Sequence, residues 1–227
     1  MSLEISYPVS LLINSLRAKA SESRAVKSAA YMKGQFPFLG VTAPERMELM
    51  RDFLQTHGKP GKAEWETVIR QLWEQPEREF QYLAQDLLAR YKSQYREEHL
   101  AWFEQLITEH SWWDTVDHLA SHCVGAYFLN YPEKRYPAID RWMQGDDLWL
   151  KRTALIFQLK YKDKTDAVLL GQLITDLMHE KDFFIRKAIG WSLRQYSKFN
   201  PGFVRDFVEE HEAELSGLSK KEALRLL

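Results

Sequence analysis

Two adjacent tryptophans followed by two aspartates, at residues 111–117, are the side chains of this sequence best suited to chemistry. In a helix, Trp113 and Asp117 stand four residues apart and share one face, as do Asp114 and Asp117 three residues apart. The segment would then present a flat aromatic surface and an anion side by side. The structural alternative is a tryptophan packed in the core and an aspartate that interacts favourably with the positive end of the helix dipole.

The composition describes a folded chain that needs neither a disulfide nor a metal. Of its 227 residues, 45% are hydrophobic and 28% are charged, which lies outside the range of disordered chains. The single cysteine, Cys123, excludes an internal disulfide and a four-thiolate iron–sulfur cluster. The seven histidines show no metal-ligand spacing. We therefore expect no metal site and no cofactor.

Membrane signals are missing from the sequence. No run approaches the roughly 20 apolar residues that span a bilayer, and the N-terminus has no basic stretch ahead of an apolar block. We expect a cytoplasmic protein without a membrane partner.

The near-neutral net charge of −1 conceals a strong polarity along the chain. Residues 63–120 carry five Lys or Arg against twelve Asp or Glu, whereas residues 134–198 carry thirteen against eight. Such a cationic region can steer a protein onto a polyanion, although a solvated helical face is the commoner explanation of a single cluster.

The first 60 residues predict two helices joined by a packed loop. Apolar spacing favours a helix over residues 9–30, and two glycines, a proline and three aromatics mark residues 31–41 as a loop. Thr42, Pro44 and Glu45 then form a helix start with a capping box, and this helix runs to about residue 56.

From residue 61 onward the sequence repeats with a period of about 35 residues. Taking Ile69, Phe103, Ile139 and Ile174 as equivalent gives steps of 34, 36 and 35 residues. No alternating strand pattern occurs, so we expect an all-α protein, an α-solenoid of paired helices with a concave face. The whole chain, 1–227, would be one such domain, with residues 1–60 as N-terminal helices and loop.

The second helix of each pair carries most of the unusual side chains. Trp113, Trp149 and Phe184 recur 36 and 35 residues apart, among Lys and Arg. Cations and flat rings along one wall suit a nucleic-acid backbone. For Trp149 and Phe184 we favour the alternative, in which they fill gaps between repeats.

Five blocks of sequence, in order over residues 25–225, point to a family: Tyr31-Met32-Lys33 with Phe38-Leu39-Gly40 and Pro44-Glu45-Arg46; Glu77-Arg78-Glu79-Phe80; Ser111-Trp112-Trp113-Asp114-x-Val116-Asp117; Trp149-Leu150-x-Arg152; and Lys187-Ala188-Ile189-Gly190-Trp191. Together they resemble the AlkD-type DNA alkylation-repair glycosylases, which are built of HEAT-like helical repeats. The tryptophan-rich block is the most discriminating. The chain ends at Leu227 in a helix-like segment, which leaves the C-terminal contacts of relatives in doubt.

The resemblance implies a catalytic group made of Trp113, Asp117, Arg152 and Trp191. Asp117 would stabilise the sugar and orient water, the two indoles would cradle the deoxyribose, and Arg152 would hold a flanking phosphate. Asp114 is assigned to helix capping or water structure. We expect DNA contacts in the concave basic groove from Tyr31, Thr42, Arg46, Lys151, Lys160, Arg186, Lys187 and Arg194.

The expected activity is hydrolysis of the N-glycosidic bond of cationic N3- or N7-alkylated purines in duplex DNA, without base flipping, by a monomer acting at the bacterial nucleoid. Two alternatives stay open. One is a HEAT-repeat protein that binds DNA without catalysis, and the other is a protein-binding scaffold, the commonest use of α-solenoids.

Overall fold

The computed structural model describes residues 6–227, and every regular element within that range is helical. The all-α prediction is confirmed. Contacts along the chain define two compact units that divide after Tyr91. The single domain with a subdivision near residue 60 stays a prediction.

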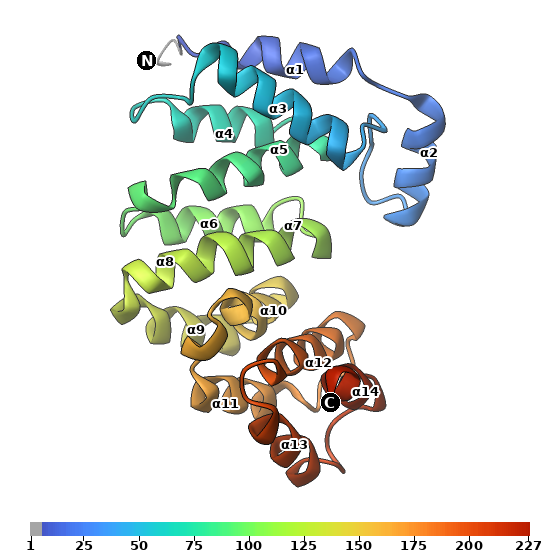
Figure 1. Cartoon of the computed structure of the whole chain (residues 1–227), viewed down its shortest axis with the longest axis vertical. Coiled ribbons are helices and arrows are strands. Elements are labelled where there is room, and N and C mark those ends of the chain that lie inside the picture. The colour runs from blue at the N-terminus through green and yellow to red at the C-terminus, as the bar shows by residue number, and fades with distance from the viewer. Residues whose placement is uncertain (1–5) are drawn as a thin grey trace. The chain divides into compact units, whose positions relative to one another are not determined.

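The first unit is a stack of antiparallel helices (Figure 1). Its core lies where α1 packs on α3 and α4, and where α4 packs on α5. The amphipathic pattern explains these contacts, because Leu12, Leu16, Trp65, Ile69 and Leu72 are all nearly or fully buried. The helices are α1 (Val9–Arg17), α2 (Glu22–Tyr31), α3 (Ala43–His57), α4 (Trp65–Trp73) and α5 (Arg78–Leu88).

The loop between α2 and α3 is held by one buried carboxylate. Glu79 of α5 accepts hydrogen bonds from the backbone amides of Leu39, Gly40 and Val41, at 2.8 to 3.2 Å. Gly40 has a φ of +78°, and a Cβ there would lie 2.4 Å from the Ser21 carbonyl oxygen. The packed loop is therefore confirmed, and so is the Thr42–Glu45 capping box at the start of α3.

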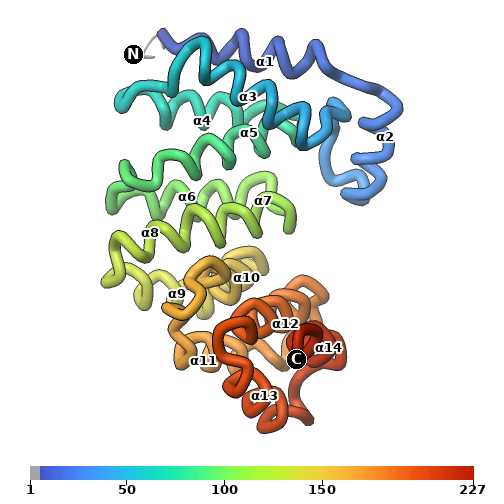
Figure 2. Tube along the Cα trace, in the orientation of Figure 1, coloured from blue at the N-terminus to red at the C-terminus, as the bar shows by residue number. Residues whose placement is uncertain are grey.

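The second unit contains the remaining helices, traced by the tube in Figure 2. Its core is strongly aromatic, and Phe103, Tyr127, Phe128, Phe157 and Trp142 are almost fully buried. The helices are α6 (His99–Thr108), α7 (Trp113–His118), α8 (Gly125–Asn130), α9 (Arg135–Gln144), α10 (Leu148–Ile156), α11 (Ala167–Leu177), α12 (Phe183–Ser197), α13 (Pro201–Glu210) and α14 (Gly217–Ala223). Short 3₁₀ turns at 89–94, 132–134, 157–160, 162–164 and 224–226 supplement them.

The positions that define the predicted period are buried in helices. Ile69, Phe103, Ile139 and Ile174 lie in α4, α6, α9 and α11, and each is at most 2% exposed. The buried positions agree with the predicted pattern. The solenoid and its period remain predictions.

A π-helix, Leu119–Val124, separates α7 from α8. The extra residue of such a segment is often found at functional sites. Here the π-helix begins two residues after Asp117, so it sets the direction of the side chains that follow the carboxylate. The sequence analysis did not anticipate it, because no side-chain pattern in residues 119–124 marks a widened helical turn.

Candidate functional site

Asp117 and Arg152 form a two-pronged ion pair between α7 and α10. The Arg152 Nε donates to Asp117 Oδ1 at 2.7 Å, and Nη2 donates to Oδ2 at 2.8 Å. The side chains are only 15% and 5% exposed. This fork geometry fixes both the position and the orientation of the carboxylate.

The remaining guanidinium nitrogen of Arg152 also has a partner within the protein. Its Nη1 donates to the Phe184 carbonyl, and its guanidinium lies 6.0 Å from the centre of the Phe184 ring. We expected Arg152 to hold a DNA phosphate. The structure gives it other partners, because α10 directs the side chain inward toward α7 and α12.

The surroundings of Asp117 perturb its acidity. Burial, the main cause, raises the pKa of the Asp117 carboxyl, and the negative charge of Asp114 acts in the same direction. The hydrogen bonds and charge of Arg152 oppose that rise. Asp114 stands in the first turn of α7, where the helix dipole favours an anion.

Asp117 and Trp191 line one cavity of about 260 Å³ in the second unit. The sequence placed these two residues 74 positions apart, and the fold brings them together. Trp113 is half-buried at the start of α7, one helical turn before Asp117, and does not line the cavity. The complete lining is Asp117, His118, Ser121, His122, Leu159, Lys160, Trp191 and Gln195.

The aromatic residues at the starts of α7, α10 and α12 pack against one another. The Trp112 ring lies 5.8 Å from Trp149 and 5.2 Å from Phe184, and the Trp149 and Phe184 rings are 5.1 Å apart. Trp149 and Phe184 therefore pack against each other and against Trp112, and their place between repeats stays a prediction. This cluster supports the ends of the helices that carry Asp117 and Arg152.

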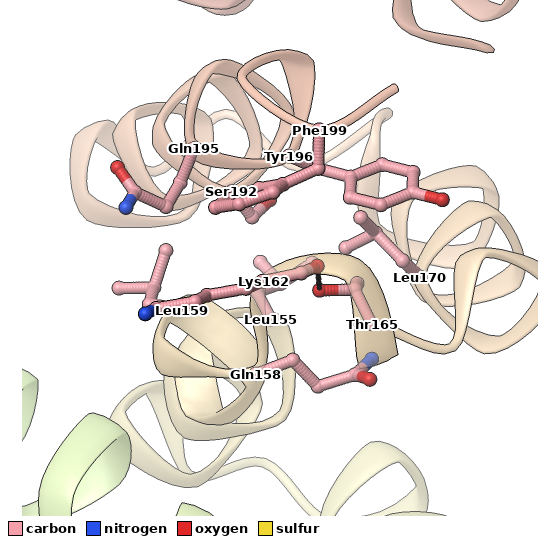
Figure 3. Close-up of a pocket in the computed structure, with 10 residues that line it drawn as sticks. All are labelled: Leu155, Gln158, Leu159, Lys162, Thr165, Leu170, Ser192, Gln195, Tyr196 and Phe199. Carbon is pink, nitrogen blue, oxygen red and sulfur yellow. Dashed lines mark hydrogen bonds between the residues drawn. The ribbon is translucent and has the colours of Figure 1, made fainter.

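A second hollow in this unit is too small for a ligand. It has a volume of about 10 Å³ and lies between the end of α10 and α12 (Figure 3). That is room for about one water molecule. Leu159 and Gln195 line both this hollow and the larger cavity.

Most of the expected DNA-binding cations of the second unit have acidic or carbonyl partners. Lys151 lies 3.9 Å from Glu180, and Arg186 donates to the Glu180 carbonyl. Lys187 and Arg194 both pair with Glu222 of α14. Lys160 is exposed and forms no ion pair within residues 6–227.

In the first unit, three expected contact residues meet at another cavity. Tyr31, Thr42 and Arg46 line a space of about 380 Å³ together with Glu79 and Tyr82. The Arg46 guanidinium lies over the Tyr82 ring at 4.6 Å, and burial lowers the Arg46 pKa.

Several residues that line the 260 Å³ cavity, or that pair with its neighbours, were not predicted as site residues from the sequence. His118 follows Asp117 directly, and His122 comes four residues later, a spacing that puts both imidazoles on one helical face. Glu222 could not be predicted, since its contact with α12 depends on tertiary packing.

Comparison with known proteins assigns this chain to a family. Residues 12–227 match the family model described as DNA alkylation repair enzyme. The chain belongs to the DNA alkylation repair enzyme family. It is also similar to a solved structure described as a predicted DNA alkylation repair enzyme from Enterococcus faecalis, with 34% identity and a TM-score of 0.82, covering 92% of this chain and 96% of that one. A search of curated proteins found no match.

Two further observations concern this alkylation-repair chain. Within residues 6–227, no three His, Cys, Asp or Glu side chains are placed to hold a metal ion. No helix in the same range is long and apolar enough to cross a membrane.

Proposed function

We propose that this protein is a monofunctional DNA glycosylase that hydrolyses the N-glycosidic bond of cationic N3- or N7-alkylated purines in duplex DNA. The observation that carries the proposal is the Asp117 carboxylate, which Arg152 fixes in place and which shares a cavity with Trp191. Membership of the DNA alkylation repair enzyme family supports it.

The chemistry needs an anion near the sugar and no acid near the base. A purine alkylated at N7 or N3 is already cationic, so the electron pair of the breaking bond neutralises its ring. Positive charge then develops on the deoxyribose, as in glycoside hydrolysis. A carboxylate beside the sugar stabilises that charge, and water attacks C1′ and releases its proton.

The ion pair with Arg152 limits how much the charge of Asp117 can stabilise the transition state. At an effective dielectric near 20, a carboxylate about 4 Å from the cationic sugar stabilises it by roughly 4 kcal/mol. A guanidinium about 8 Å from the sugar cancels roughly 2 kcal/mol of that stabilisation. The remaining 2 kcal/mol corresponds to about a thirtyfold rate increase. Positioning of the attacking water by the rigid carboxylate is therefore an essential second contribution.

Trp191 and Trp113 have the role of flat surfaces for the sugar and backbone. In our proposal the sugar enters the cavity at Asp117, and Trp191 lies against it from α12. The damaged base stays in the duplex, since the cavity is lined by groups suited to a sugar and phosphate. The enzyme acts as a monomer in the bacterial cytoplasm, without a cofactor, at the first step of base excision repair.

We further propose that the helix pairs beginning with α4, α6, α9 and α11 are HEAT-like repeats whose second helices form a basic groove for DNA. Lys151, Lys160 and Arg186 would contact phosphates directly, and Lys187 and Arg194 would exchange Glu222 for a phosphate. Tyr31, Thr42 and Arg46 would contact the duplex from the first unit.

The test is chromatography of the bases released from methylated duplex DNA. The proposal requires release of 7-methylguanine or 3-methyladenine. DNA binding without release would favour a catalytically inactive DNA-binding protein, and an absence of both would favour a protein-binding scaffold.

A further inference from the structure

We propose that Lys160 and the stacked pair His118–His122 bind the DNA phosphate next to the lesion sugar, and that this contact takes up a proton. The inference rests on the proposed function, because it takes Asp117 to mark the position of the sugar. It adds a phosphodiester site built from His118 at the end of α7, His122 of the π-helix and Lys160 of the 3₁₀ turn at 157–160.

The first argument is that the expected phosphate ligand is already engaged. Arg152 directs its Nε and Nη2 to Asp117 and its Nη1 to the Phe184 carbonyl, and the residue is 4% exposed. A sugar placed at Asp117 brings its flanking phosphates to the same cavity. Lys160 is the one Lys or Arg among the cavity-lining residues, and it is exposed.

The second argument is the placement of the two imidazoles. His118 and His122 stack with ring centres 4.3 Å apart and planes 18° apart, and both line the cavity with Lys160. Two cations at that separation repel each other, so the stack takes one proton and not two. A singly protonated stack and Lys160 together present two positive charges and several N–H donors to the single negative charge of a phosphodiester.

Local hydrogen bonding identifies the nitrogen at which the His122 ring takes up a proton. The Ser121 hydroxyl donates its hydrogen to the backbone carbonyl oxygen of Asp117 at 2.7 Å. The hydroxyl oxygen must therefore accept a hydrogen bond from His122 Nδ1, which lies 3.1 Å away. Nδ1 of His122 therefore keeps its hydrogen in the neutral ring. The second proton goes to Nε2.

The charges around the stack make protonation depend on the ligand. Burial, and then the positive charges of Lys160 and Lys92, lower the pKa of the His122 imidazole. Asp117 is the acidic group among the cavity-lining residues, and Arg152 neutralises it. A phosphate that pairs with Lys160 removes the repulsion and adds an attraction, so binding and protonation favour each other.

The experiment measures DNA affinity with no chemistry taking place. The probe is an undamaged-base duplex that carries one tetrahydrofuran abasic analogue, titrated by fluorescence anisotropy at constant ionic strength between pH 6 and pH 8. We expect the Kd of the unaltered protein to rise about three- to tenfold over this range. His122→Gln should reduce the rise to less than about twofold, and Lys160→Gln should weaken binding at every pH.

Two controls make the outcome specific. His179→Gln changes an exposed histidine outside the cavity and should keep the full pH dependence. Replacing either phosphate beside the analogue with a neutral methylphosphonate alters no protein residue, and one of the two replacements should abolish the pH dependence. Melting curves check that each variant is folded.

The inference is overturned if His122→Gln keeps the full pH dependence, or if neither methylphosphonate changes it. Either outcome is independent of base release. If the Kd shows the expected pH dependence but the protein releases no base, the proposed function is contradicted and the phosphate site is still supported.

Discussion

At the scale of single residues, Asp117 is the side chain on which the proposed chemistry depends. Asp117→Asn should lower the single-turnover release rate of 7-methylguanine by about a hundredfold or more, since the field and the water contact are both lost. DNA affinity should stay the same or rise, because a repulsion with phosphate is removed. Both quantities can be measured on one methylated duplex.

Asp117→Asn also leaves Arg152 buried beside a neutral amide, so a stability check is needed. Removing one partner of a buried pair can cost about 3 to 5 kcal/mol. Melting curves therefore accompany the kinetics. Equal losses in rate and affinity in a folded variant would show that Asp117 has a structural role instead.

Asp114 offers a matched control whose effect is on pH dependence. The carboxylate form of Asp117 is the active one, so the rate should fall as the pH drops through the Asp117 pKa. The negative charge of Asp114 raises that pKa. Asp114→Asn should therefore change the rate little at neutral pH and move the acid limb of the profile to lower pH, as seen in single-turnover rates from pH 4.5 to 8. An unchanged acid limb would show that another group sets it.

The sequence pointed to Asp117 and Arg152 as site residues, a role that stays a proposal, but it did not predict that they pair. The spacing of Asp117 and Trp113, and the resemblance that added Arg152 and Trp191, selected residues that the fold brings near one cavity. The phosphate role of Arg152 stays a prediction, and only the fold shows that its guanidinium turns inward to Asp117 and the Phe184 carbonyl. The histidine pair was visible in the sequence, but its stacking depends on the π-helix.

At the scale of helices, the contact of α12 with α14 explains Gly190 in the block that ends at Trp191. A Cβ at Gly190 would lie 2.5 Å from the Glu222 Cβ and 2.8 Å from the Ser219 carbonyl oxygen. Gly190→Ala should force α14 away, lower stability by about 1 to 3 kcal/mol and slow base release through the adjacent Trp191. Denaturant unfolding and single-turnover kinetics would measure the two effects.

Gly217→Ala is the control for this prediction. Gly217 begins α14, and a Cβ there meets no atom within 4 Å. Alanine also favours helix more than glycine does, so stability should be unchanged or slightly higher. If both variants lost the same stability, the close approach at Gly190 would not be the cause.

Local sequence predicted the start of α3 correctly, but the single helix predicted over residues 9–30 is wrong, because the chain breaks there into α1 and α2. The capping box at Thr42 rests on neighbouring residues and lies where the sequence placed it. Ile69, Phe103, Ile139 and Ile174 are buried in helices, and the period that connects them stays a prediction. The partner of Lys187 and Arg194 is Glu222, 28 or more residues away. Such pairing depends on how α14 packs on α12, which the period does not specify.

At the scale of the whole molecule, charge is distributed along the chain in a way that net charge hides. The excess of cations at residues 134–198 lies in the second unit, which also holds Asp117 and the 260 Å³ cavity. Part of that positive charge is already balanced by Glu180 and Glu222. In the proposed DNA complex, attraction therefore comes from a few local groups, and binding should weaken less steeply with added salt than the number of cations suggests, because the salt slope scales with the number of phosphate contacts.

The same distribution of groups predicts how lesions are selected. Asp117 can stabilise a cationic sugar, whereas protonation of a neutral base would need an acid placed beside the base. Cationic N3- and N7-alkylpurines should be released even with a bulky substituent, and hypoxanthine and 1,N6-ethenoadenine should stay in place. Duplexes that each carry one lesion, followed by chromatography of the released base, compare these rates directly. Efficient release of a neutral lesion, or rejection of every substituent larger than methyl, would instead indicate a pocket that reads the shape of an extruded base.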